Sequence, residues 1–145
     1  PELDLYEYFK GETKGYGIVQ DRKGTLTRYF TVDITGTVEA DGSLKLYELF
    51  DWNDGEKSTR TWIISKDGET RFTGTAEDVE GEGKGEASGN VLNWSYVLNL
   101  EVDGRVWKIN FDDWMFLVTK EVLINRAKLS KFGFTVGEVT IAFNK

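Results

Sequence analysis

Five charged residues stand at positions where the alternation of a β-strand would place apolar side chains. Glu48, for example, lies between Leu46 and Phe50, whose side chains point to the same face of an extended strand. The full set is Arg28, Glu48, Arg60, Asp78 and Asp113. Because an isolated buried charge is very costly, such groups must pair or face water. The pattern predicts two cations and three anions inside a lumen, unless β-bulges shift the register and turn some of them outward.

These charges suit two kinds of chemistry and one structural role. In a binding site, an arginine would hold the polar head of a ligand. In an enzyme, Asp113, Glu48 or Asp78 would act as general acid or base while an arginine stabilises developing negative charge. In a structural role, arginine forks would hold carboxylates and tie strands together. A carboxyl pKa strongly raised inside an open pocket would favour the enzyme.

Aromatic side chains make up much of the same predicted inner face. They would line an apolar pocket with a few polar points, which is the usual character of a small-molecule site, or they would fill a solid core. The aromatic residues with inward parity are Phe30, Phe50, Trp62, Phe72, Trp94, Tyr96, Trp107 and Phe111.

The composition excludes several classes of function. The 145 residues include no His and no Cys, so the chain has no Ser-His-Asp triad, no thiol nucleophile and no conventional zinc or haem site. We expect neither a metal nor a cofactor. The formal net charge of −7 disfavours binding to a phosphate backbone, which needs clustered Lys and Arg, so nucleic acid is not an expected partner.

The elements that would position these side chains are strands separated by tight turns. Pairs such as Asp41-Gly42 and Asp103-Gly104 supply the positive φ angles of hairpins, and the segments between turns alternate in polarity. We predict one all-β domain over residues 1–145, with about nine or ten antiparallel strands in up-and-down order. Only residues 3–9 fit a short helix, which we expect to plug one end of the sheet.

A long meander of strands must protect its edges, and closure into a barrel removes them. Glycines inside strand segments favour closure because they relieve crowding where a strand bends; these are Gly36, Gly74, Gly81, Gly83 and Gly85. We therefore predict a closed barrel rather than a sandwich. A barrel of about eight to ten strands has room for one small ligand.

Residues 123–133 form a basic segment in an acidic chain, with three cations and no acid. The segment would pair with neighbouring carboxylates or meet an anionic partner. Within it, we expect Arg126 to form a cation–π stack at the end of the barrel on an aromatic ring such as Tyr16 or Trp114.

Several sequence blocks, in order along nearly the whole chain, resemble a known bacterial family. The blocks are GYGIVQDR at 15–22, FTVD at 30–33, DDWM at 112–115, NR at 125–126, KFG at 131–133 and GEV at 137–139. Together they resemble the DUF3833 family of lipoproteins, which has no established activity. The resemblance implies a periplasm-facing envelope location, with attachment to the membrane only through a lipidated Cys upstream of Pro1. A cytoplasmic location is the alternative, and Tyr16 stands where family members more often carry Trp.

Two further considerations, one from gene neighbourhood and one from architecture, bear on the ligand. Members of the family are often encoded near enzymes that modify fatty acids, which implies a lipid. The predicted barrel also resembles the lipocalin or calycin type, in which a Gly-x-Trp near the first strand packs under a late arginine. Gly15-Tyr16-Gly17 and Arg126 match that pattern loosely. Likeness of architecture does not establish a function.

The leading hypothesis is a monomeric, non-enzymatic binding module. Its lumen would hold a small apolar or lipid-like ligand, such as a fatty acid, with Arg28, Arg60 or Arg126 on the carboxylate. The alternatives are an isomerase- or cyclase-type enzyme acting on a lipid-like substrate, and a structural or interaction barrel with a filled core. The residues predicted to contact a ligand are Arg28, Phe30, Glu48, Phe50, Arg60, Trp62, Asp78, Trp94, Tyr96, Trp107, Asp113 and Arg126.

Overall fold

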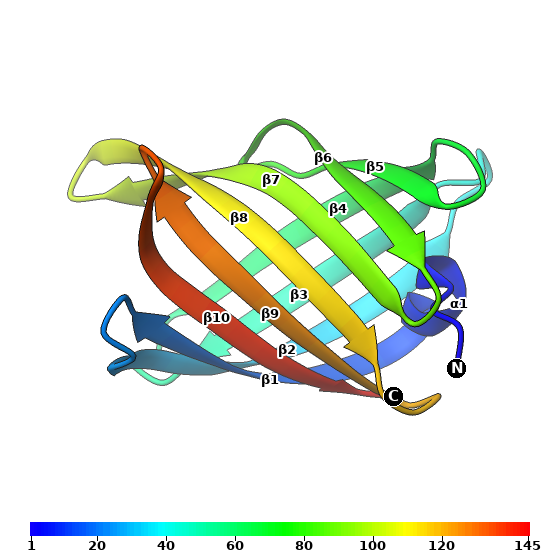
Figure 1. Cartoon of the computed structure of the whole chain (residues 1–145), viewed down its shortest axis with the longest axis horizontal. Helices are drawn as coiled ribbons and strands as arrows, with labels where there is room; N and C mark the ends of the chain where they lie inside the picture. The colour runs from blue at the N-terminus through cyan, green and yellow to red at the C-terminus, as the bar shows by residue number, and fades with distance from the viewer.

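The computed structural model describes all residues 1–145 and shows a closed antiparallel barrel of ten strands with one short helix (Figure 1). The fold class predicted from the sequence is therefore confirmed. The elements in chain order are α1 (Leu5–Phe9), β1 (Gly11–Asp21), β2 (Leu26–Val38), β3 (Leu44–Trp52), β4 (Lys57–Lys66), β5 (Arg71–Thr75), β6 (Val79–Ser88), β7 (Val91–Val102), β8 (Arg105–Leu117), β9 (Val122–Lys131) and β10 (Phe134–Asn144).

Every strand pairs with its neighbours in the sequence, and the last strand returns to the first. Strand β1 pairs with β10 in a register that sets Gly15 opposite Phe143 and Ile18 opposite Thr140. This pairing closes the up-and-down barrel and leaves no free edge. The weakest part of the wall is at β5, because the β4–β5 ladder runs only from Ile63 to Lys66.

The turns have the chemistry expected of hairpins. Asp103 and Gly104, between β7 and β8, have φ angles of 51° and 75°. Positive φ at both central residues is the signature of a type I′ turn, whose twist matches that of the flanking strands. The register shifts at three places along the barrel, between Val19 and Gln20, between Glu80 and Lys84, and between Thr135 and Gly137.

Helix α1 closes one end of the barrel, as predicted. Asp4 caps its N-terminus by accepting hydrogen bonds from the backbone N–H groups of Tyr6 and Glu7. The Tyr6 hydroxyl donates to the carbonyl of Ile64 on β4 at 2.9 Å, and the Tyr8 hydroxyl donates to that of Glu121 at 2.8 Å. The helix is therefore tied to opposite parts of the rim. It is too short to cross a lipid bilayer.

Glycine allows the plug to sit against the wall. A Cβ atom on Gly36 of β2 would lie 1.8 Å from the backbone oxygen of Phe9, so any side chain there would displace the helix. Gly74 of β5 and Gly83 and Gly85 of β6 also make room for a large side chain. At Gly85, a Cβ would lie 2.5 Å from the ring of Trp94, and Gly74 crowds the same ring. We expected the strand glycines to relieve bends. Gly81, with a φ of +61° at the register shift of β6, fits that expectation, whereas Gly74, Gly83 and Gly85 make space for Trp94.

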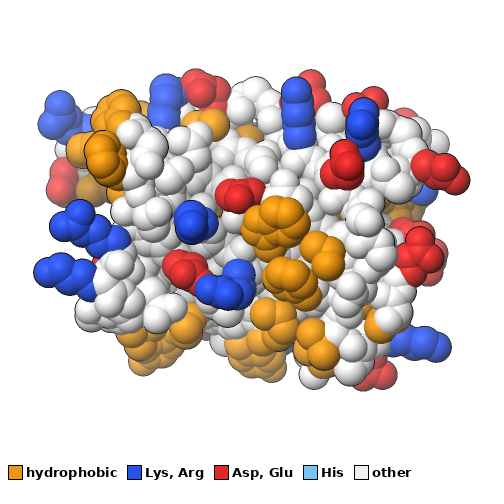
Figure 2. Space-filling view, viewed as in Figure 1, with side chains coloured by type: hydrophobic (Ala, Val, Ile, Leu, Met, Phe, Trp, Pro, Cys, Tyr) orange, Lys and Arg blue, Asp and Glu red, His pale blue; other side chains and the backbone are white.

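The outer face is mixed in character (Figure 2). In that view, hydrophobic side chains gather over part of the barrel wall, with acidic and basic side chains beside them. Strands β1 and β8 expose the large side chains Tyr16, Ile18, Trp114 and Phe116. These outward residues alternate with the inward ones described next.

Candidate ligand-binding site

A cavity of about 480 Å³ occupies the interior of the barrel. It extends from Leu5 and Phe9 at the helix end to Arg28, Trp52 and Glu56 at the opposite end, which we call the mouth. All five charged residues predicted to point inward line this cavity, namely Arg28, Glu48, Arg60, Asp78 and Asp113. The lumen is therefore hollow, and the alternative of a filled core is not what the structure shows.

Aromatic rings form much of the cavity wall. Trp62 meets Trp94 and Tyr96 edge to face, at centroid distances of 5.4 and 5.1 Å. Tyr96 stacks on Phe111 at 4.9 Å with an interplanar angle of 14°. Such pairs fix the rings in place, so the wall is both apolar and rigid. The predicted inward aromatics that line the cavity are Phe30, Phe50, Trp62, Trp94, Tyr96 and Phe111.

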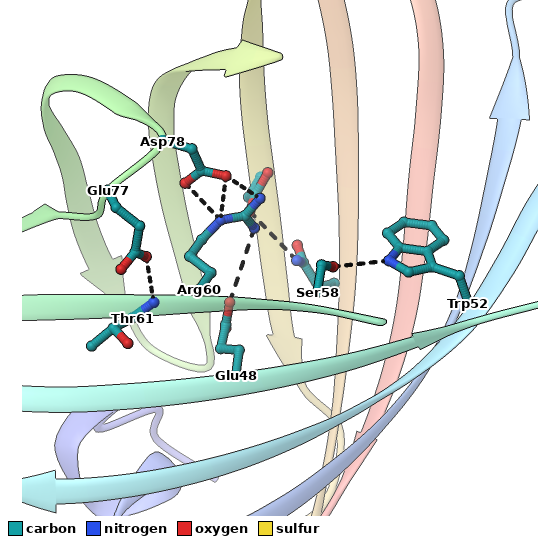
Figure 3. Close-up of polar contacts among 9 residues, drawn as sticks. Glu48, Trp52, Ser58, Arg60, Thr61, Glu77 and Asp78 are labelled. Carbon is teal, nitrogen blue, oxygen red and sulfur yellow. Dashed lines mark hydrogen bonds and ion pairs between the residues drawn. The ribbon is translucent and has the colours of Figure 1, made fainter. Parts of the chain in front are cut away.

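One arginine organises the polar part of the wall (Figure 3). Nε and Nη2 of Arg60 donate to the two carboxylate oxygens of Asp78 at 3.0 and 2.9 Å. Nη1 lies 4.0 Å from Oε1 of Glu48, which is directly opposite Arg60 on β3. Asp78 reaches this position because the neighbouring carboxylate of Glu77 accepts the backbone N–H of Thr61, at 2.6 Å. Side chains thus fasten the segment before β6 to β4 where the backbone ladder has stopped.

Burial changes the ionisation of the carboxyl groups in the lumen. Burial raises the pKa of Glu48 to about 7, and Asp78 adds to the rise while Arg60 opposes it. Burial also raises the pKa of Asp113 to about 7, against a lowering hydrogen bond from Asn125. Near neutral pH, each group is therefore poised between its neutral and charged forms. This is the raised carboxyl pKa in an open pocket that the sequence reasoning named as the mark of an enzyme.

Three buried polar atoms of cavity-lining residues have no partner within the protein, and two of them belong to the paired residues Asp113 and Asn125. Asn125 of β9 donates from Nδ2 to Oδ2 of Asp113 at a long 3.5 Å, but Oδ1 of each residue accepts no hydrogen bond. Each residue is only 5% exposed. The two free oxygens are acceptors in a buried wall, which is an unfavourable arrangement unless something donates to them.

The mouth carries its own charge cluster. Nη2 of Arg28 pairs with Asp54 at 2.9 Å and with Glu56 at 3.1 Å, and its guanidinium stacks over Trp52 at 3.8 Å. Nε of Arg28 has no partner. Trp52 is held in turn by a hydrogen bond from its ring N–H to the Ser58 hydroxyl, at 3.1 Å (Figure 3).

Three residues predicted for the ligand site or for the aromatic lining of the pocket do not line the cavity. Arg126 points outward from β9, with 62% of its side chain exposed, and pairs with Glu138 of β10 at 2.6 Å. The expected stack of Arg126 on Tyr16 or Trp114 is absent, because this carboxylate holds the guanidinium instead. Phe72 is buried, but it packs beside Tyr6 of the helix rather than on the cavity.

Trp107 is the third of these residues. It lies on the β7–β8 hairpin, 39% exposed, and does not line the cavity. Strand β9 pairs with β8 only from Asn110 onward, and β6 pairs with β7 only as far as Leu98. The hairpin tip is therefore a two-stranded ribbon that extends beyond the barrel. A side chain there can alternate with the lumen-facing residues and still not lie in the lumen.

Asn125, deep in the cavity, and Trp52, at its mouth, are site residues that were not among the predicted ligand contacts. The signal for Asn125 was present in the sequence. Asn125 alternates with Leu123 and Ala127, both buried, so its parity could have placed it inside. Its charged neighbour Arg126 was predicted as the ligand contact instead, because it lies in the basic segment 123–133 and loosely matches the late arginine of calycin-type barrels. An uncharged amide at an apolar position is an equally good signal.

The sequence matches, over residues 1–145, the family described as "Protein of unknown function (DUF3833)". The chain belongs to the DUF3833 family. This confirms the resemblance seen in the sequence blocks. A search of curated proteins finds no match to this DUF3833 chain.

Two solved structures are similar to this DUF3833 barrel. One is the S-type phycobiliprotein lyase CPES from Guillardia theta, with a TM-score of 0.72, 11% sequence identity, and coverage of 97% of this chain and 90% of that one. The other is a protein of unknown function from the DUF3598 family of Nostoc punctiforme PCC 73102, with a TM-score of 0.72 and 16% identity. The similarity covers all of this chain and 50% of the DUF3598 chain. At these identities the likeness concerns the fold, and it is consistent with the calycin-like barrel predicted above.

Proposed function

We propose that this DUF3833 protein binds a small, predominantly apolar ligand inside the barrel. The observation that carries the proposal is the cavity of about 480 Å³, whose wall is mostly aromatic and aliphatic with a few converging polar groups. Small-molecule sites have this size and character. The barrel is plugged at the helix end, so the ligand enters at the mouth beside Arg28 and Trp52. The likeness of fold to a phycobiliprotein lyase is compatible with a barrel that handles a small molecule.

A fatty acid belongs to the proposed ligand class, but its carboxylate finds few free partners. Arg60 is committed to Asp78 and Glu48, and Arg126 lies on the outer surface. Nε of Arg28, at the mouth and between two acidic side chains, has no partner, whereas the one group of Arg60 without a hydrogen bond, Nη1, faces Glu48. A bound fatty acid would therefore place its carboxylate at the mouth and its chain in the lumen.

The experiment is a fluorescence titration with N-phenyl-1-naphthylamine, an apolar dye that brightens when it leaves water. We expect saturable binding of one dye per chain. Ala127 lines the cavity and is buried, so Ala127→Phe fills the lumen and is expected to weaken binding at least tenfold. Ala142 lies on the outer face of the neighbouring strand β10, so Ala142→Phe is the matched control and should bind like the natural protein.

The proposal would be wrong if the dye bound without saturation, or if both phenylalanine variants bound it as well as the natural protein. Urea unfolding of each variant checks that Ala127→Phe retains a folded barrel. Overpacking a core typically costs about 1–3 kcal/mol, which a barrel of this size can tolerate.

One observation favours a second candidate, an enzyme acting on a lipid-like substrate. The raised pKa values of Glu48 and Asp113 would suit a general acid or base near neutral pH. We propose Asp113 for this role, because its Oδ1 is free, with Arg60 balancing charge nearby. Titration of the ¹³C-labelled carboxyl groups by NMR is the test. Values near 7 for both groups support this candidate, and values below about 5 remove its basis.

The monomeric state and the envelope location stay predictions. Analytical ultracentrifugation and fractionation of cells that produce the full-length protein would test them.

A further inference from the structure

We propose that the deep part of the cavity recognises a hydrogen-bond donor on the ligand, a hydroxyl, amide N–H or ammonium group, through Oδ1 of Asp113 and Oδ1 of Asn125. The inference rests on the proposed function and names the chemical class of ligand that the site takes. It replaces the expectation of a carboxylate bound by an arginine inside the lumen.

The first support is the pair of unpartnered acceptors. Asp113 on β8 and Asn125 on β9 come from adjacent strands, and both side chains line the cavity while being 95% buried. Their mutual hydrogen bond is long and uses only one oxygen, so each residue keeps one acceptor free. Each free oxygen exposes less than 1 Å² in the barrel, so it is cut off from water as well as from protein donors. An unsatisfied buried acceptor is costly, so a ligand that packs against this wall and donates to it gains affinity.

The second support is that the lumen has no comparable pair of free donors that could bind an anionic ligand. Arg60 is its only deep cation, and its Nε and Nη2 already donate to Asp78 while Nη1 faces Glu48. Three carboxyl groups, those of Glu48, Asp78 and Asp113, share the surroundings of this one guanidinium. The only arginine donor left for a fourth carboxylate is Nη1 of Arg60, which faces Glu48, and the surrounding acidic groups would repel the added charge. A hydroxyl, amide or ammonium donor meets several acceptors in the same region.

The position of the pair fixes the orientation of the ligand. Asp113 lies opposite Trp94 and Ala127 in the barrel wall and four residues before the end of β8, toward the helix end. The donor end of the ligand therefore enters first, and its apolar part lies along the rings of Trp62, Tyr96 and Phe111. The mouth has the opposite polarity, since Nε of Arg28 is a donor without a partner.

The test compares three ligands with the same ten-carbon chain, 1-decanol, decylamine and decanoate, by isothermal titration calorimetry in 150 mM salt at pH 8, where most of the Asp113 carboxyl is ionised and can only accept. We expect decanol and decylamine to bind at least tenfold more tightly than decanoate. Asn125→Leu removes one acceptor and Asp113→Asn replaces a carboxylate with an amide that can donate to Asn125. Each variant should reduce the preference to about threefold or less. Glu138→Gln removes an outward acidic group of β10 and should leave the preference unchanged.

The inference is overturned if decanoate binds as tightly as decanol, or if the preference for donors survives both variants. In either case the proposed function stands, because ligands still bind. If none of the three ligands binds, the proposed function fails and the inference fails with it. The ligand comparison on the natural protein decides the matter even if a variant does not fold.

Discussion

Replacing Asp113 with Asn should change how the stability of the barrel depends on pH. The carboxyl pKa of Asp113 is raised from 3.8 to about 7 in the folded protein, chiefly by burial. The folded state therefore binds a proton that the unfolded state has already released. The free energy of unfolding consequently falls as pH rises from about 4 to about 7, and it levels off above that. Asn resembles the neutral carboxyl group in shape and does not titrate. The Asp113→Asn variant should therefore not lose unfolding free energy through this group as the pH rises.

The size of the effect follows from the same shift. A rise from 3.8 to about 7 corresponds to about 4 kcal/mol of destabilisation of the natural protein at pH 8, relative to a group that stays neutral. The natural protein and Asp113→Asn should thus have similar unfolding free energies at pH 4. At pH 8 the variant should be the more stable by up to about 4 kcal/mol.

Urea unfolding followed by tryptophan fluorescence at pH 4, 5, 6, 7 and 8 measures this difference. Asp51→Asn is the matched control, because Asp51 points outward from β3, is exposed and is not among the charges that shift the pKa of Asp113. Its curve should run parallel to that of the natural protein. Parallel curves for Asp113→Asn as well would refute the reasoning, since they would mean that the Asp113 carboxylate is not desolvated by the barrel.

Three further substitutions test other parts of the structure by urea unfolding. Arg60→Met should destabilise the protein by about 3 kcal/mol, because it leaves the Asp78 carboxylate without its main partner in the lumen; a loss below about 1 kcal/mol would contradict the ion-pair network. Gly36→Ala should cost about 2 kcal/mol, because the new Cβ collides with the backbone of Phe9, and unchanged stability would show that the plug is not held against β2. Arg126→Ala should cost less than about 1 kcal/mol and leave dye binding within twofold, because its ion pair is exposed; a large loss of binding would place Arg126 in the site after all.

Much of the barrel could be predicted because alternation is a local property of the chain. Glu48 stands between two apolar residues of the same parity, and strand geometry alone then aims it at the lumen. Turn chemistry at Asp103-Gly104 is equally local. Closure was also accessible, although β1 and β10 lie at opposite ends of the chain, because unpaired edges are unfavourable for any long meander.

The partners of the charges could not be predicted, because they depend on register between strands. Arg126 finds Glu138 on β10 just beyond a register shift between Thr135 and Gly137, and no pattern in the sequence announces that shift. Asp78 reaches Arg60 only because β5 is short and the segment after it folds back onto β4. Trp107 has the inward parity, but the barrel wall ends before it.

The most direct test of a hollow, ligand-binding lumen is a crystal structure of the protein grown with 10-bromodecan-1-ol, with anomalous data collected at the bromine edge. We predict one strong bromine peak inside the barrel, with the hydroxyl oxygen at hydrogen-bond distance from Asp113 or Asn125. A bromine peak only on the outer surface, or a lumen closed by side chains with no alcohol inside, would contradict the account.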